Sequence, residues 1–310
     1  MVGWSTGEVK RRSVLLGAPA LLLASRAKPA LAVTIDDIGW RSIPEPWRDR
    51  AADTLLATLE QHTVKAMLFV AGSNVDDAEG KALLQRWNDA GHSLGNHTYE
   101  HRRFGRANST MPWYGEDILR CDELLRGYSR FRRYFRFPTL HEGGTARERD
   151  SVRSFLREHG YRNGRVTIDA SDWYYDSRLR ERLKADGRFG VSRYREPYLE
   201  HMLDRGRHYD EVCRQVLGRS MRHTVLIHYN LVNTLFLSDL LDEFRKRGWA
   251  FVDAEEAFAD TAFDRDPDVL PAGQSLLWML AKETGRYSGR LEYPGESEAT
   301  EKPKLDRLGL

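Results

Sequence analysis

The stretch Ala30-Leu31-Ala32-Val33-Thr34-Ile35-Asp36-Asp37 decides the fold class of this chain. Its first six residues are mostly small or β-branched, which is typical of a buried strand, and the strand ends at two carboxylates. Because the chain turns at a strand end, both carboxylates can reach one cavity in different roles. One can bind a metal while the other stays free as a base, although Asp is also favoured in turns for structural reasons.

Strand-like and helix-like segments alternate along the chain from this point. The predicted strands are 30–35, 65–70, 92–96, 133–137, 164–168, 223–228 and 250–254, and the predicted helices are 46–61, 79–90, 114–127, 146–159, 193–218 and 238–247. This alternation predicts an α/β fold with a parallel sheet, either open or closed into a barrel.

Ionisable residues recur at the C-terminal ends of the predicted strands. Active sites of parallel α/β proteins are built at that edge of the sheet. We therefore expect one site there, formed by Asp36, Asp37, His97, Arg136, Asp169 and His228.

Two histidines in His97-Thr98-Tyr99-Glu100-His101 have the spacing of a metal-chelating pair. If the chain forms a helical turn there, both imidazoles lie on one face and can bind one ion. Together with one carboxylate they make a ligand set with open positions, as catalytic zinc sites have. Two exposed histidines on a turn are the alternative.

Three further residues suit an acid–base site. Arg136 would keep a nearby carboxylate ionised if it points into an acidic pocket. A carboxylate such as Asp172, in the segment Asp169–Trp173, would orient an imidazole. His228 ends an apolar strand and would act as an acid or base there. The alternative is a structural core histidine that is bonded to a backbone carbonyl.

Five segments in this order resemble the motifs of the polysaccharide deacetylases, the NodB-homology type of carbohydrate esterase family four. They are TIDDIG (34–39), HTYEH (97–101), FRFP (135–138), DASDW (169–173) and LIH (226–228), and the resemblance covers roughly residues 30–255. It implies a distorted, seven-stranded (β/α) barrel.

The same resemblance implies roles for individual residues. Asp37, His97 and His101 would bind a divalent metal, with zinc expected, and Asp36 would be the catalytic base. His228 would be the acid, Arg136 would hold Asp36, and Asp172 would orient His228.

The sequence departs from the family pattern beside two motifs. Ile35 and Ile38 replace Phe and Gly around the aspartate pair, and the usual Gly two residues after Pro138 is absent. In the family, a backbone N–H just after that proline helps to bind the oxyanion, and here Thr139 or Leu140 would supply it. Trp173 would contact the substrate.

The N-terminal segment predicts export. Lys10, Arg11 and Arg12 precede an apolar run over 14–24 that is too short for a membrane span, as in a signal peptide. The order Arg-Arg-Ser-Val-Leu-Leu resembles a twin-arginine signal. We expect a signal peptide over 1–27, a periplasmic product and no stable membrane span, with an uncleaved N-terminal anchor as the alternative.

The remaining composition excludes some classes. The net charge of +2 gives no indication of a nucleic-acid partner. We expect the barrel over 28–285 and a polar C-terminal tail over 286–310. The cysteines Cys121 and Cys213 match no zinc motif, and buried free thiols are favoured over a disulfide.

The sequence thus predicts a metal-dependent hydrolase that removes acetyl groups from an N- or O-acetylated polysaccharide or oligosaccharide. A hydrolase that acts at the same site on a non-sugar amide or ureide is one alternative, and a non-catalytic carbohydrate-binding barrel is another. The sugar, the metal and the oligomeric state stay open.

Overall fold

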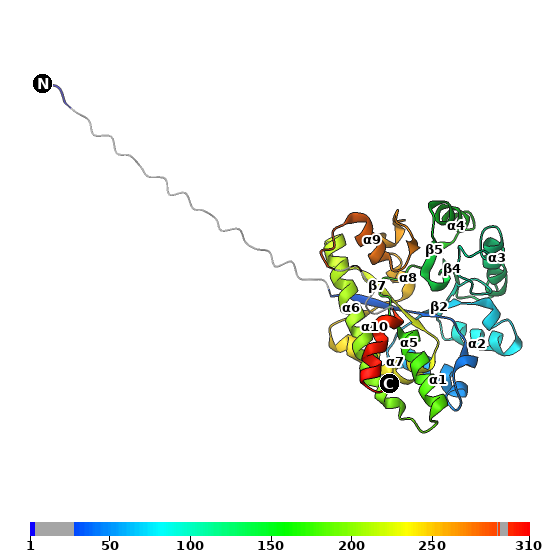
Figure 1. The fold of residues 1–310 in the computed structure, drawn as a ribbon. Coiled ribbons are helices and arrows are strands. Elements are labelled where there is room, and N and C mark those ends of the chain that lie inside the picture. Colours follow the sequence, from blue (N-terminus) through cyan, green and yellow to red (C-terminus); the bar gives the residue numbers. More distant parts are fainter. Residues whose placement is uncertain (4–27, 290, 292–296) are drawn as a thin grey trace.

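The computed structural model describes residues 1–3, 28–289, 291 and 297–310 (Figure 1). Most of the expected signal peptide, residues 4–27, lies outside these ranges. Among the described residues, no helix combines the length and apolar character that a membrane crossing needs.

One parallel sheet organises the domain. Its path runs β6-β4-β3-β2-β1-β7, and β8 pairs with the first residues of β1. The strands are β1 (Ala30–Asp36), β2 (Met67–Val70), β3 (Ser93–Asn96), β4 (Phe131–Phe135), β6 (Arg162–Asn163), β7 (Arg222–His228) and β8 (Ala250–Phe251).

Strand β1 lies inside the sheet, and all of its residues after Ala30 are buried. It pairs with β7 over its whole length, so that Asp36 lies directly opposite His228. Its last residues also pair with β2. The register alone therefore places two of the expected catalytic residues side by side at the carboxyl edge.

The two ends of the sheet are connected by the segment after β6. Gly164 N–H donates to the Phe135 carbonyl near β4 (2.7 Å), and Ile168 N–H donates to the Thr224 carbonyl on β7 (2.9 Å). This crossing gives the sheet the form of a distorted half-barrel, which confirms the predicted fold class.

The predicted strand over 164–168 is not a regular strand. Its hydrogen bonds are divided among β4, β7 and the Leu276 N–H, which donates to the Val166 carbonyl (2.7 Å), so that only an isolated bridge between Ile168 and Val225 forms. Gly164 suits the crossing, because a Cβ there would meet the Phe69 ring at 2.4 Å.

Helices cover the sheet (Figure 1). The long ones are α1 (Arg48–Gln61), α2 (Ala78–Asp89), α3 (Trp113–Leu125), α4 (Ala146–Glu158), α5 (Asp172–Ala185), α6 (Arg195–Leu217) and α7 (Leu231–Lys246). The sequence patterns did not predict α5, and α7 begins well before the predicted residue 238. Its start is fixed by Asn230, whose side chain accepts from the Asn233 N–H.

Short elements complete the domain. The antiparallel pair β5 (His141–Gly143) and β9 (Ala272–Gly273) lies apart from the main sheet. The others are α8 (Ala254–Ala257), α9 (Leu276–Thr284) and the 3-10 turns Trp40–Ser42, Gly72–Asn74, Pro138–Leu140, Val191–Tyr194 and Thr261–Asp264. Cys121 and Cys213 are buried and unpaired.

The segment expected as a polar tail contains a packed helix, α10 (Glu298–Arg307). Ser297 caps its N-terminus, and Leu305 and Glu301 are fully buried. The polar composition of 286–310 conceals this helix, because only a few of its positions face the domain.

Candidate metal and catalytic site

Four strands deliver their expected residues to one edge of the sheet. Asp36 ends β1 and His228 ends β7, while His97 directly follows β3 and Arg136 directly follows β4. Asp37 follows β1 with a φ of 55°, a turn that keeps it beside Asp36. The structure therefore brings these residues together at the carboxyl edge.

Asp37, His97 and His101 form a cluster with the geometry of a metal site. Their ligand atoms lie within 4.8 Å of one another. The Asp37 Oδ1 atom lies 3.2 Å from His101 Nε2 and 3.8 Å from His97 Nε2. This oxygen is buried and has no hydrogen-bond partner among the described residues, which is costly unless a cation binds there.

His97 is prepared as a neutral ligand. Its Nδ1 is 2.7 Å from the Arg136 carbonyl, so the proton lies on Nδ1 and the Nε2 lone pair faces Asp37. Burial, together with the nearby His101, holds the pKa of His97 well below its usual value. One carboxylate and two imidazoles suit zinc or a similar divalent ion.

The chain does not form a helical turn over 97–101. The Tyr99 and Glu100 N–H groups both donate to the Asp117 carboxylate, at 3.2 and 3.1 Å, and Thr98 and His101 have positive φ values of 65° and 53°. A bend held by side-chain acceptors thus replaces the helix, and it brings the two imidazole centroids to 4.8 Å.

Asp36 is held by Arg136. The Arg136 Nη1 group donates to both Asp36 oxygens at 3.1 and 3.2 Å, Nη2 donates to Thr34, and the guanidinium lies over the Phe69 ring. Burial raises the pKa of Asp36 to about 6, and the Arg136 charge opposes that rise. The pKa of this carboxyl group is therefore close to the neutral range in which a general base works best.

His228 forms a dyad with Asp172, the first residue of α5. His228 Nδ1 lies 2.8 Å from Asp172 Oδ1, and Asp172 Oδ2 accepts from the His228 N–H at 2.8 Å. Asn230 and Asn233 donate to the same oxygen. Burial would lower the pKa of His228, but the Asp172 carboxylate and the nearby Asp37 and Asp36 raise it to about 10.

A cavity of about 450 Å³ opens over these groups. Trp173, Thr139 and Leu140, the residues expected to contact a substrate, all line it, and Trp173 is 42% exposed. Thr139 and Leu140 have φ values of 54° and 51°. Of the other aromatic residues near the motifs (Trp40, Trp113, Tyr174 and Tyr175), none lines this cavity.

The sequence patterns missed several residues of the cavity wall. Gln274, after β9, lines it and donates its N–H to the Leu140 carbonyl at 2.7 Å. No local motif marks this residue, because it reaches the site only through the pairing of β5 with β9. Asp169, which was expected at this edge of the sheet, also lines the cavity, and burial raises its pKa to about 7.

A parallel half-barrel with an Asp–His–His cluster and two carboxylate-paired groups at its carboxyl edge belongs to the NodB-type class of α/β folds. Residues 24–164 match the family model described as polysaccharide deacetylase. The matched segment holds the first three motifs, and the structure brings Asp172 and His228 to the same edge.

Two peptidoglycan-N-acetylglucosamine deacetylases of Bacillus cereus are similar to part of the chain. One is 26% identical over 119 residues, which is 38% of this chain and 40% of the relative. The other is 30% identical over 126 residues, or 39% of this chain and 42% of the relative. The matches thus span about two fifths of these relatives.

Solved structures share the fold. The chitin deacetylase of the fungal pathogen Colletotrichum lindemuthianum matches with a TM-score of 0.51 and 20% identity, over 76% of this chain and 90% of that one. A wild-type pseudoenzyme of carbohydrate esterase family four from Bacillus anthracis matches with a TM-score of 0.51 and 18% identity, over 76% and 66%. Because one neighbour is a pseudoenzyme, the fold alone assigns no activity.

Proposed function

We propose that this chain is a metal-dependent deacetylase that hydrolyses N- or O-acetyl groups of a polysaccharide or oligosaccharide. The observation that carries the proposal is the buried, unpartnered Asp37 Oδ1 beside His97 and His101. Asp36, which is paired with Arg136, and His228, which is paired with Asp172, both line the same cavity. A site that only binds carbohydrate would need neither pair.

The protein's own groups divide the proton transfers between them. Asp36 accepts the proton of the attacking water while Arg136 holds its carboxylate in place. The new C–O bond forms at the acetyl carbonyl, and His228 then donates a proton to the departing amine or hydroxyl as the acetyl bond breaks. Bound at Asp37, His97 and His101, a divalent ion such as zinc would supply Lewis acidity to this reaction.

Two features of the cavity wall suit an acetylated sugar. The Leu140 N–H already donates to the Phe137 carbonyl at 2.9 Å, so Thr139 is the better placed of the two candidates for binding the oxyanion. The exposed Trp173 ring offers an apolar face on which a sugar ring can pack.

The direct test is acetate release from a panel of acetylated oligosaccharides and small amides. We expect release from at least one N- or O-acetylated glycan, loss of at least about 100-fold of the rate with chelator, as typical for removal of a catalytic ion, and recovery when zinc is restored. Turnover of amides or ureides only would favour the non-sugar hydrolase. No turnover of any compound by zinc-loaded protein would favour the binding barrel.

The pH dependence should change in a defined direction in an Asp172→Asn variant. His228 has a pKa raised to about 10, so its acid form persists up to alkaline pH. Removing the Asp172 charge removes the main cause of that rise, and burial then lowers the pKa. We expect the alkaline limb of the kcat/KM profile to move to lower pH, and an unchanged limb would show that His228 is not the acid.

Export of the chain, with removal of residues 1–27, remains our proposal. It rests on the twin arginines and the apolar run that follows them. Cell fractionation with N-terminal sequencing of the mature protein tests it, and an intact cytoplasmic chain would contradict it.

A further inference from the structure

The C-terminal helix α10 is docked on α5, the helix that carries Asp172 at its start. Arg178 of α5 donates to Asp306 at 2.7 Å, and Arg182 of α5 donates to the Leu310 carbonyl at 3.3 Å. Leu305, a residue of α10, is fully buried. The helix is therefore a fixed part of the domain, close to a catalytic element (Figure 1).

A buried carboxylate connects α10 with α6. Glu301 is fully buried, and its Oε2 accepts from the Tyr175 hydroxyl at 2.8 Å and lies 3.5 Å from His201 Nδ1. On the other side of the imidazole, His201 Nε2 accepts from the Ser171 N–H at 2.8 Å. A neutral imidazole has one donor and one acceptor nitrogen, so an accepting Nε2 requires the proton on Nδ1, which faces Glu301.

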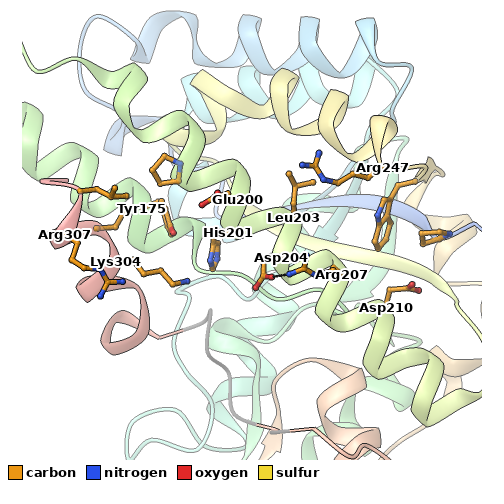
Figure 2. A pocket seen from close by; sticks show the side chains of 15 residues that line it. Tyr175, Glu200, His201, Leu203, Asp204, Arg207, Asp210, Arg247, Lys304 and Arg307 are labelled. Carbon is orange, nitrogen blue, oxygen red and sulfur yellow. Dashed lines mark hydrogen bonds and ion pairs between the residues drawn. The ribbon is translucent and has the colours of Figure 1, made fainter.

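The Glu301 carboxylate favours the same tautomer as the Ser171 N–H does. A cavity of about 810 Å³ lies between α6 and α10, and His201, Tyr175 and Lys304 line it (Figure 2). The carboxylate only accepts hydrogen bonds, so it can bond Nδ1 only when Nδ1 carries the proton.

The contacts from Glu301 through His201 to Ser171, called the relay below, end at the Asp172–His228 dyad. Ser171 precedes Asp172 and occupies the N-cap position of α5. Its N–H bond to His201 fixes the backbone at that point, and Asp172 places both its oxygens against His228.

We propose that Glu301 and His201 are positioning residues of the active site, which make the C-terminal helix part of the catalytic machinery by holding Ser171 and therefore the Asp172–His228 dyad. This inference rests on the proposed function for its kinetic consequences only, because the geometry of the dyad can be measured without substrate.

A Glu301→Gln variant tests the relay. The Lys304 ammonium group, which lies 3.2 Å from Glu301 Oε1, would hold the amide oxygen at that position. The amide NH₂ would then take the position of Oε2, where it donates to the Tyr175 hydroxyl, faces His201 Nδ1 and selects the opposite tautomer. Nε2 would then carry a proton against the Ser171 N–H, and the two donors would repel each other. A Lys304→Gln variant is the matched control, because it removes a half-exposed partner of Glu301 and keeps the carboxylate.

The primary readout is the pH titration of the His228 imidazole by NMR on the purified full chain without substrate. The charges that face His228 are Asp172, Asp36, Asp37 and Asp169, with His97 nearby, and the Glu301 variant changes none of them. We expect a lower titration midpoint for Glu301→Gln and a wild-type midpoint for Lys304→Gln.

The second readout is kinetic. A misplaced dyad should lower kcat by about 10- to 100-fold, the effect expected of a small displacement of a catalytic group, with little change in KM. The alkaline limb of the pH profile of kcat/KM should move to lower pH. A merely structural role would lower Tm without moving that limb or the midpoint.

A second variant, His201→Leu, removes the acceptor for Ser171 and leaves α10 unchanged, so the test stands even if Glu301→Gln fails to fold. A folded variant of either kind with the wild-type His228 midpoint would overturn the relay. If the chain lacked deacetylase activity, the NMR titration would still decide the matter, so failure of the proposed function and failure of the relay are distinguishable.

Discussion

An Asp36→Asn variant should lose nearly all turnover while it keeps its metal. Asp36 is the carboxylate that lies beside the metal cluster without belonging to it, and Arg136 holds both of its oxygens. The amide cannot accept a proton at the pH of the assay, and loss of a general base costs about 10²- to 10⁴-fold in rate. Acetate release and bound metal per chain should be measured on the same preparation.

Stability needs a separate control in this variant. Removing one partner of a buried ion pair can cost about 3–5 kcal/mol, because the other charge stays behind. Arg136 also donates to Thr34 and to the Gly164 carbonyl, and the oxygen of the introduced amide could still accept from it, so we expect a folded protein with a lower Tm. Wild-type activity in a folded variant would show that Asp36 is not the base.

The edge of the sheet was predictable from sequence because it depends on local signals. A short run of apolar residues predicts a buried strand, and Asp36, His97 and His228 stand at the ends of such runs. Parallel pairing then brings these ends together, as the register of Asp36 opposite His228 shows. No long-range information is needed for that inference beyond the strand alternation itself.

Other parts of the site depend on contacts that no local pattern contains. The bend at Thr98 is set by Asp117, which is 18 residues from Tyr99 in the sequence. Gln274 reaches the cavity through the pairing of two very short strands. Glu301 lies in a segment whose composition predicts a tail, yet in the structure it belongs to α10 and lies beside His201 of α6.

The family match and the structure also contribute different parts of the interpretation. The matched segment ends at residue 164, before Asp172 and His228. Sequence similarity therefore covers Asp37, His97 and His101, and only the geometry joins the Asp172–His228 pair to them.

A His97→Ala variant should lose its metal. The Nε2 atom of His97 is one of three ligand atoms within 4.8 Å, and the ring is prepared for binding by its bond to the Arg136 carbonyl. A site with two protein ligands binds zinc more weakly than a site with three. We expect bound metal well below one per chain after dialysis, and turnover reduced by at least about 100-fold even when zinc is added, since the Lewis acid is then misplaced.

The matched control is His92→Ala, because His92 is also a buried histidine and directly precedes β3, the strand that His97 follows. Its Nδ1 accepts from the Ala66 N–H, and its ring packs beside Trp87, far from the ligand cluster along β3. Both variants should lower Tm, because each removes a buried ring and leaves a backbone group without its partner. Only His97→Ala should lose metal. If it retained one ion per chain while folded, the cluster of Asp37, His97 and His101 would not be the metal site, and the buried Asp37 oxygen would need another partner.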